Sequence, residues 1–87
     1  MKNVTSAFLD KVPGDIADAI LVEQASAAMT EKLAKVRDEK GRSGWHKPSC
    51  STDDLMSKLL AKVEEGDMVD VMNYAAMIYV RNELYSS

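Results

Sequence analysis

Residues 15 to 40 form a long stretch of the chain that contains no Gly or Pro. Its apolar residues recur at spacings of three and four, namely Ile16, Ile20, Leu21, Ala25, Ala28, Met29, Leu33 and Val36. This period is typical of an amphipathic α-helix, and Gly41, which follows at once, suits a left-handed helix C-cap. A helix of this length in a chain of 87 residues favours an all-α fold.

Start and stop signals predict three further helices. A short helix over about residues 5–12 ends at the helix-breaking pair Pro13-Gly14. Another covers residues 52–65 and stops before Gly66, and the last covers residues 67–84. Because 87 residues lie near the low end of the usual domain range, we predict one domain over residues 1–87. Its fold class is all-α, a small bundle of about four helices.

Three of the predicted helix starts carry an oxygen-bearing residue followed three positions later by an acid. The pairs are Asp15 with Asp18, Ser51 with Asp54, and Asp67 with Asp70. The first oxygen can accept a hydrogen bond from a free backbone amide, and the second acid favours the positive end of the helix dipole. The alternative is a metal-binding Asp-x-x-Asp motif, which needs two such pairs to converge. We expect caps and no metal site.

The predicted last helix is apolar around most of its circumference. Between Val69 and Val80 the strongly polar residues are Asp70 and Asn73. Such a helix must be buried on nearly all sides, and a short chain can hardly surround it alone. We therefore expect a homo-oligomer, with a dimer favoured, whose interface is formed by Ala25, Ala28, Met29, Val71, Met72, Ala75, Met77 and Ile78. The alternative is a tight monomer in which the loop and the first helix, through Phe8 and Leu9, cover the gap.

Composition excludes several classes of protein. The net charge of −3 argues against a general nucleic-acid binder, and one Cys cannot form an internal disulfide. No apolar run approaches the roughly 20 residues of a membrane span, and the N-terminus lacks the apolar stretch of a secretory signal. The expected location is the cytoplasm, without membrane association.

The segment from Gly41 to Cys50 holds the only Trp, His and Cys of the chain. His46 and Cys50 supply two zinc ligands where four are needed, and as a nucleophile and base they lack a third group. We therefore expect no catalytic residue and no cofactor. Trp and Arg are enriched at interface hot spots, so we expect a binding surface formed by Arg37, Lys40, Arg42, Trp45, His46 and Lys47. The alternative is that Trp45 folds back to fill a thin core.

Two other functions fit parts of this pattern. An indole beside cations can hold a nucleobase and phosphate, so the same loop could bind nucleotides or other phosphorylated ligands. A magnesium-dependent nucleotide pyrophosphohydrolase is the other alternative. The all-helical enzymes of that class carry a Glu-x-x-Glu pair, and this chain has none.

A longer pattern resembles a family of small proteins of tailed bacteriophages and prophages. It begins with Lys40-Gly41-Arg42-Ser43-Gly44-Trp45 and continues through Cys50 to Gly66-Asp67, Asp70-Val71 and Asn73. Ser43 replaces a Gly of the family pattern, and Met68 stands at the usual Pro, which is favoured at the first helical position. The resemblance implies a phage accessory protein made in an infected bacterium, and it implies no particular activity. We expect a non-enzymatic protein that binds and modulates or inhibits a bacterial host protein.

Overall fold

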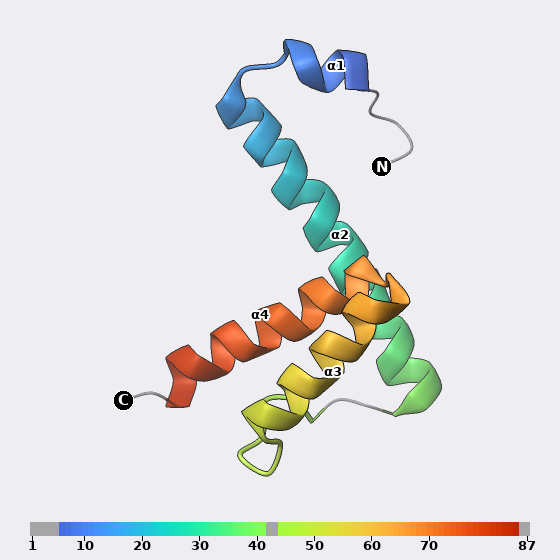
Figure 1. Cartoon of the computed structure of the whole chain (residues 1–87), viewed down its shortest axis with the longest axis vertical. Helices are drawn as coiled ribbons and strands as arrows, with labels where there is room; N and C mark the ends of the chain where they lie inside the picture. The colour runs from blue at the N-terminus through green and yellow to red at the C-terminus, as the bar shows by residue number, and fades with distance from the viewer. Residues whose placement is uncertain (1–5, 42–43, 86–87) are drawn as a thin grey trace.

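The computed structural model describes residues 6–41 and 44–85, and within these ranges every regular element is an α-helix (Figure 1). The helices are α1 (Ser6–Lys11), α2 (Gly14–Lys40), α3 (Thr52–Glu65) and α4 (Met68–Tyr85). The all-α prediction and the four helices are confirmed. The bounds of α3 agree with the prediction. Helix α2 begins one residue earlier than predicted, α1 ends one residue earlier, and α4 is shifted by one residue toward the C-terminus at both ends. Thr5, the predicted first residue of the short helix, lies outside the described residues.

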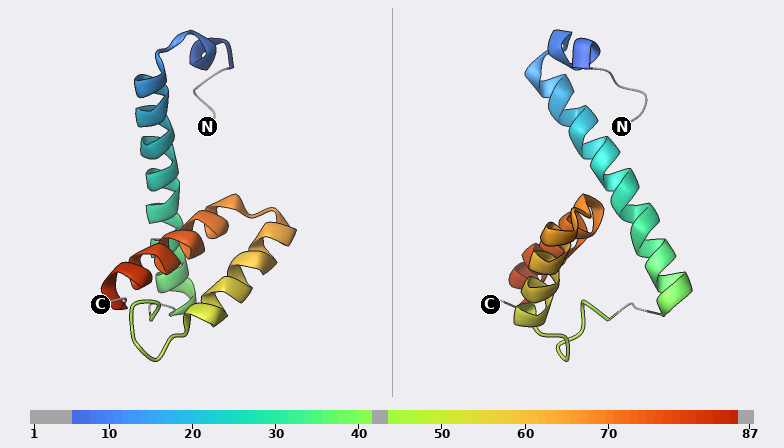
Figure 2. Two further views of the ribbon diagram at one scale, coloured as in Figure 1. Left: turned by 60° about the vertical axis from the view of Figure 1, so that its left-hand side comes forward. Right: turned by 45° about the vertical axis from the view of Figure 1, so that its right-hand side comes forward.

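The helices form an open arrangement in which α3 and α4 make a hairpin against the C-terminal half of α2. Helix α4 packs against both α3 and α2, while α1 lies at the other end of α2 (Figures 1 and 2). The radius of gyration is 15.3 Å. A compact chain of this length would have a radius of gyration of about 12 Å. The difference reflects the N-terminal half of α2, which projects from the hairpin.

Capping sets the ends of α3 and the start of α4. The Ser51 hydroxyl accepts a hydrogen bond from the Asp54 amide at 2.9 Å, and Asp67 Oδ1 accepts one from the Asp70 amide at 3.1 Å. These two predicted caps are confirmed. At the C-terminal end of α3, Gly66 has a φ of 77°, the left-handed conformation expected of a helix C-cap.

The predicted cap at Asp15 is wrong. Helix α2 begins at Gly14, and the N-cap position is held by Pro13, which has extended backbone angles and no side-chain donor or acceptor for a cap. Because proline fixes φ near −65°, it sets the entry of the chain into the helix two residues earlier than a cap at Asp15 would. Asp15 therefore lies in the first turn, where its charge favours the helix dipole.

Polar contacts at two residues of α2, Met29 and Lys32, fasten α4 to that helix. The Asn73 side chain is only 4% exposed, and its Nδ2 donates to the Met29 carbonyl of α2 at 3.3 Å. Lys32 Nζ of α2 lies 3.1 Å from Asp67 and 3.5 Å from Asp70, at the start of α4. Since both contacts meet α2 at residues 29–32, they fix where the hairpin crosses the long helix.

The residues predicted to form an oligomer interface lie in mixed surroundings. Met29, Val71, Met72, Met77 and Ile78 are half-buried, as are Ala25 and Ala28, whereas Ala75 is exposed. Helix α4 still has exposed apolar side chains, with Tyr79 67% exposed. Helix α1 lies at the other end of α2, away from the hairpin, whereas the loop contacts the last turns of α4 through Arg81 and Tyr85. Completion by a second copy stays a prediction.

Candidate recognition groove

The loop between α2 and α3 turns twice in succession before α3 begins. The Lys47 amide donates to the Gly44 carbonyl at 3.1 Å, and the Cys50 amide donates to the Lys47 carbonyl at 3.0 Å. Two consecutive turns leave carbonyl groups that no regular helix or strand can satisfy. Those carbonyls need donors from another part of the chain.

Arg81 of α4 supplies these donors. Its side chain is only 5% exposed, and Nη1 donates to the Trp45 carbonyl at 2.7 Å and to the Lys47 carbonyl at 2.9 Å. Nη2 donates to the Cys50 carbonyl, and Nε donates to the Thr52 hydroxyl at 3.3 Å. Charge-assisted bonds from a planar guanidinium are strong and directional. Arg81 therefore fixes the loop conformation and joins it to the start of α3.

Tyr85 extends this connection by one turn of α4. Its hydroxyl donates to the His46 carbonyl, and its ring lies 5.1 Å from the Arg81 guanidinium carbon, within the range of a cation–π contact. The last turn of α4 thus contacts successive carbonyls of the loop. The loop is held as part of the hairpin.

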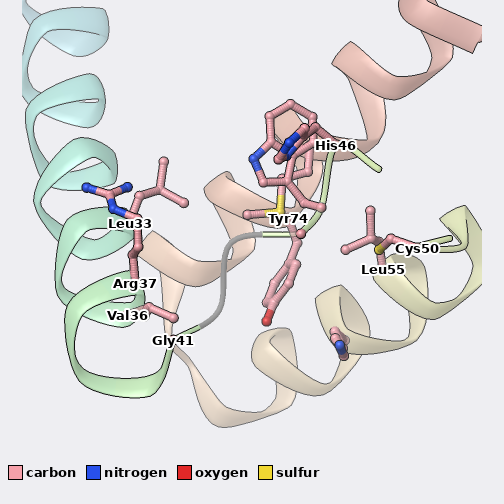
Figure 3. Close-up of a pocket in the computed structure, with 12 residues that line it drawn as sticks. Leu33, Val36, Arg37, Gly41, His46, Cys50, Leu55 and Tyr74 are labelled. Atoms are coloured by element: carbon pink, nitrogen blue, oxygen red, sulfur yellow. The ribbon is translucent and has the colours of Figure 1, made fainter. Parts of the chain in front are cut away.

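The held loop closes one side of a groove. The groove has a volume of about 720 Å³ and runs between the C-terminal half of α2 and the hairpin. In Figure 3, Leu33, Val36 and Arg37 of α2 form one wall, Cys50 and Leu55 lie across from them, and Tyr74 lies between. The lining is completed by Gly41, Gly44, Trp45, His46, Lys58 and Met77.

The charges on the groove are positive. The charged residues that line it are Arg37 and Lys58, and none of its described lining residues is a carboxylate. Lys58 also forms an exposed ion pair with Asp54 at 3.1 Å, and a pair of this kind contributes little free energy. Arg37 has no ion pair among the described residues. The groove therefore combines apolar walls with cations at its edge.

Trp45 is half-buried and lines the groove. Its indole meets the His46 imidazole edge to face, with ring centroids 5.7 Å apart and an interplanar angle of 71°. Because Arg81 holds the Trp45 carbonyl, the indole is displayed from a fixed backbone. The side chain is positioned both to pack on the walls and to contact an occupant.

The six residues predicted as a binding surface are only partly brought together. Arg37, Trp45 and His46 line the groove. Lys40 and Lys47 are exposed and are not among the lining residues. Arg42 lies outside the described residues.

Sequence reasoning missed Arg81 and most of the groove wall. Leu55, Lys58 and Tyr74 were not singled out as site residues, and Met77 was assigned to the oligomer interface although it lines the groove. One signal was present, because Asn73, Met77 and Arg81 recur every four residues and so share one face of α4. An Asn and an Arg on one face of a largely apolar helix indicate polar partners within the fold.

The acidic pair Asp67 and Asp70 lies at the hairpin crossing, where Lys32 contacts both carboxylates and Lys62 contacts Asp70. The backbone amide of Asp70 and the Lys32 ammonium lower the pKa of Asp67 below its ordinary value. The same contact with Asp67 raises the pKa of Lys32. Within the described ranges, no three His, Cys, Asp or Glu side chains converge in a way that could hold a metal ion.

No helix in the described part of the chain has both the length and the apolar character that crossing a membrane requires. Comparison of the chain with protein-family models, with curated proteins and with solved structures gives no match.

Proposed function

We propose that this chain is a non-enzymatic accessory protein of a bacteriophage, and that it binds a host protein in the bacterial cytoplasm. The binding site is the groove between α2 and the hairpin. The observation that carries the proposal is the composition of that groove, which has apolar and aromatic walls, two cations and no carboxylate among its described lining residues. The phage setting comes from the sequence pattern around Trp45 and Asp67.

The groove chemistry defines the kind of host segment that fits. An amphipathic helix binds such a groove by burying its apolar face, with anchors at helical spacing. Acidic residues beside those anchors would face Arg37 and Lys58, and this charge complementarity would select the partner and speed association. We therefore propose an acidic amphipathic helical segment as the recognised element of the host protein.

A second candidate is a nucleotide or another phosphorylated small molecule. The groove volume of about 720 Å³ lies within the range of small-molecule sites. Trp45 and Tyr74 supply aromatic rings and Arg37 supplies a phosphate-binding guanidinium. The half-exposed setting of Trp45 is compatible with either occupant.

A capture experiment tests the proposal. The wild-type chain, the groove variant Arg37→Glu/Lys58→Glu and the control variant Lys11→Glu/Lys35→Glu would be immobilised and exposed to bacterial lysate. The control makes the same change in net charge at exposed positions away from the groove. We expect one host protein to be retained by wild type and control and lost by the groove variant.

Two results would contradict host-protein binding through the groove. Equal retention by all three chains would contradict binding through the groove. The second candidate would be favoured if no host protein is captured and nucleoside phosphates raise the melting temperature of the wild-type chain. In that case the groove variant should show no rise in melting temperature.

A further inference from the structure

The α3–α4 hairpin has one side against α2 and one side turned away from it. Figure 2 shows no helix of the described residues on the side turned away. Apolar side chains of α3 are exposed there, with Met56 43%, Leu60 58% and Val63 47% exposed. These three residues recur at steps of four and three, so they form one stripe along the helix.

The α3 stripe does not belong to the groove. The α3 residues that line the groove are Leu55 and Lys58. Successive residues of an α-helix are about 100° apart, so Met56 is turned about 100° from Leu55 in one direction and Lys58 about 60° in the other. The stripe therefore lies on the opposite side of the hairpin from the groove.

Helix α4 contributes a second stripe to the same side. Met68 is 53% exposed, Tyr79 is 67% exposed, and Ala75 between them is also exposed. Steps of seven and four residues place these three on one face of α4. Asn73 faces α2, and Ala75, two residues later, is turned about 160° away from it. None of the three lines the groove.

Together the two stripes form the back face of the hairpin, defined by Met56, Leu60, Val63, Met68, Ala75 and Tyr79. Exposed carboxylates lie at its edges. Glu64 follows Leu60 by four residues, and Glu83 follows Tyr79 by four. An apolar centre with a polar rim is the usual anatomy of a protein interface.

The small core of the chain indicates what covers this face. Among the side chains described, from 9 to 41 and from 44 to 85, Leu55 is the one apolar side chain that is buried, at 3% exposed. A short chain buries a modest fraction of its surface, and further apolar burial is needed for stability. The occupant must therefore be present whenever the chain folds. A second copy meets this condition, whereas a host protein is met after folding.

We infer that two copies of the chain pair through their back faces, so that two α3–α4 hairpins form a four-helix bundle. The back face is two helices wide, and a second hairpin has the same width and the same two apolar stripes. Facing hairpins of this kind bury their stripes in a common core. The like charges at the rim stay in water, where salt screens them.

This pairing leaves both grooves open, because each groove lies on the α2 side of its own hairpin. The dimer would carry two equivalent binding sites that face away from each other. A partner that is itself repeated would then be held by two sites at once and bound more tightly. The pairing itself does not rest on the proposed function.

A charge placed in the back face tests the pairing by sedimentation equilibrium of the full chain. Leu60→Glu is compared with Leu21→Glu, because Leu21 is an equally exposed leucine, at 62%, on α2. We expect wild type and Leu21→Glu to be dimers whose melting temperature rises with chain concentration. Leu60→Glu should be monomeric, with a melting temperature that does not depend on concentration.

Tyr79→Ser provides a variant that a single chain tolerates, since the Tyr79 ring is two-thirds exposed within one copy. It should raise the dimer dissociation constant by about tenfold or more, because a buried tyrosine is a frequent interface anchor and each dimer loses two. Val22→Ser, at a position 64% exposed on α2, should leave the dissociation constant unchanged. A wild-type chain that stays monomeric up to millimolar concentration would overturn the inference. Equal weakening by the back-face variants and the α2 controls would also overturn it.

The groove variant Arg37→Glu/Lys58→Glu separates this inference from the proposed function. It should dimerise as wild type does, because neither residue lies on the back face. A monomeric wild-type chain that captures a host protein through the groove would contradict the pairing alone. A dimer that captures the same proteins with and without the groove charges would support the pairing and contradict the proposed function.

Discussion

The Arg81 guanidinium donates to the Trp45 carbonyl at 2.7 Å, across 36 residues of sequence. This contact makes the loop that carries Trp45 a part of the α3–α4 hairpin. Because the same guanidinium also holds the carbonyls of Lys47 and Cys50, one buried side chain determines the shape of the loop that closes the groove.

Substituting Arg81 should destabilise the chain and disorder the loop. Arg81→Met keeps much of the side-chain volume but leaves three loop carbonyls without donors, and we expect a loss of roughly 2–4 kcal/mol in the free energy of unfolding. Urea unfolding followed by circular dichroism measures this loss. Asn82→Ala, at an exposed neighbouring position, should change stability little. Equal midpoints for Arg81→Met and wild type would show that the loop does not depend on Arg81.

A carboxylate at position 73 should make stability fall as pH rises. In Asn73→Asp the ionised side chain would face the Met29 carbonyl in a buried site, which costs about 2–4 kcal/mol at neutral pH. Burial raises the folded pKa of such a carboxyl above its unfolded value of about 3.9, so the penalty develops as pH rises through that interval. Below it, the protonated carboxyl can donate to Met29. The free energy of unfolding measured from pH 3 to 7 checks this, with the exposed Asn82→Asp as a control. A difference in unfolding free energy between Asn73→Asp and wild type that does not change with pH would contradict it.

Asp67 should contribute stability with the opposite dependence on pH. Its pKa is lowered from the ordinary 3.8, first by the Asp70 amide and then by Lys32. A lowered folded pKa means that the contribution is complete above the unfolded pKa and disappears as pH falls through the folded pKa. Asp67→Asn keeps an oxygen that can accept the cap bond and removes the charge. The free energy of unfolding of this variant should therefore be lower than that of wild type at pH 7. The difference should shrink below pH 4 and in high salt. A difference in unfolding free energy that persists in acid would contradict the electrostatic explanation and indicate altered packing.

The glycine at the end of α3 should be sensitive because of its backbone alone. Gly66 has a φ of 77°, and an added Cβ would meet no atom within 4 Å. Gly66→Ala should therefore cost about 1 kcal/mol from the left-handed conformation. Gly14→Ala is the matched control, since Gly14 has equal space and begins α2 without a positive φ. Thermal unfolding should show a lower melting temperature only for Gly66→Ala; similar values for both would contradict the backbone explanation.

Local signals in the sequence were enough to place the helices. Ser51 and Gly66 bound α3 because a cap and a left-handed glycine act through neighbouring backbone groups. The start of α2 was misplaced because Pro13 and the Asp15 pair are competing local signals, and the proline prevailed.

The groove was less accessible to sequence reasoning because it depends on contacts between distant residues. Trp45 and Arg37 were expected at a site, yet nothing local shows that Tyr74 and Met77 complete it. The spacing of apolar residues shows which faces of α4 must be buried, but it does not show which helix or which second copy buries each face. For that reason Met77 was placed at an oligomer interface, and the acceptors of Arg81 could not be foreseen.

The most direct test of groove recognition is a titration of the wild-type chain with a synthetic amphipathic helical peptide that has acidic residues beside its apolar stripe. The peptide is acidic and contains no Trp, so the emission of Trp45, the only Trp of the chain, reports on the groove. We predict a saturable change in that emission at dilute protein concentration, absent for a scrambled peptide and for Arg37→Glu/Lys58→Glu. An unchanged emission, or an equal change with the scrambled peptide, would contradict recognition of acidic amphipathic helices by the groove.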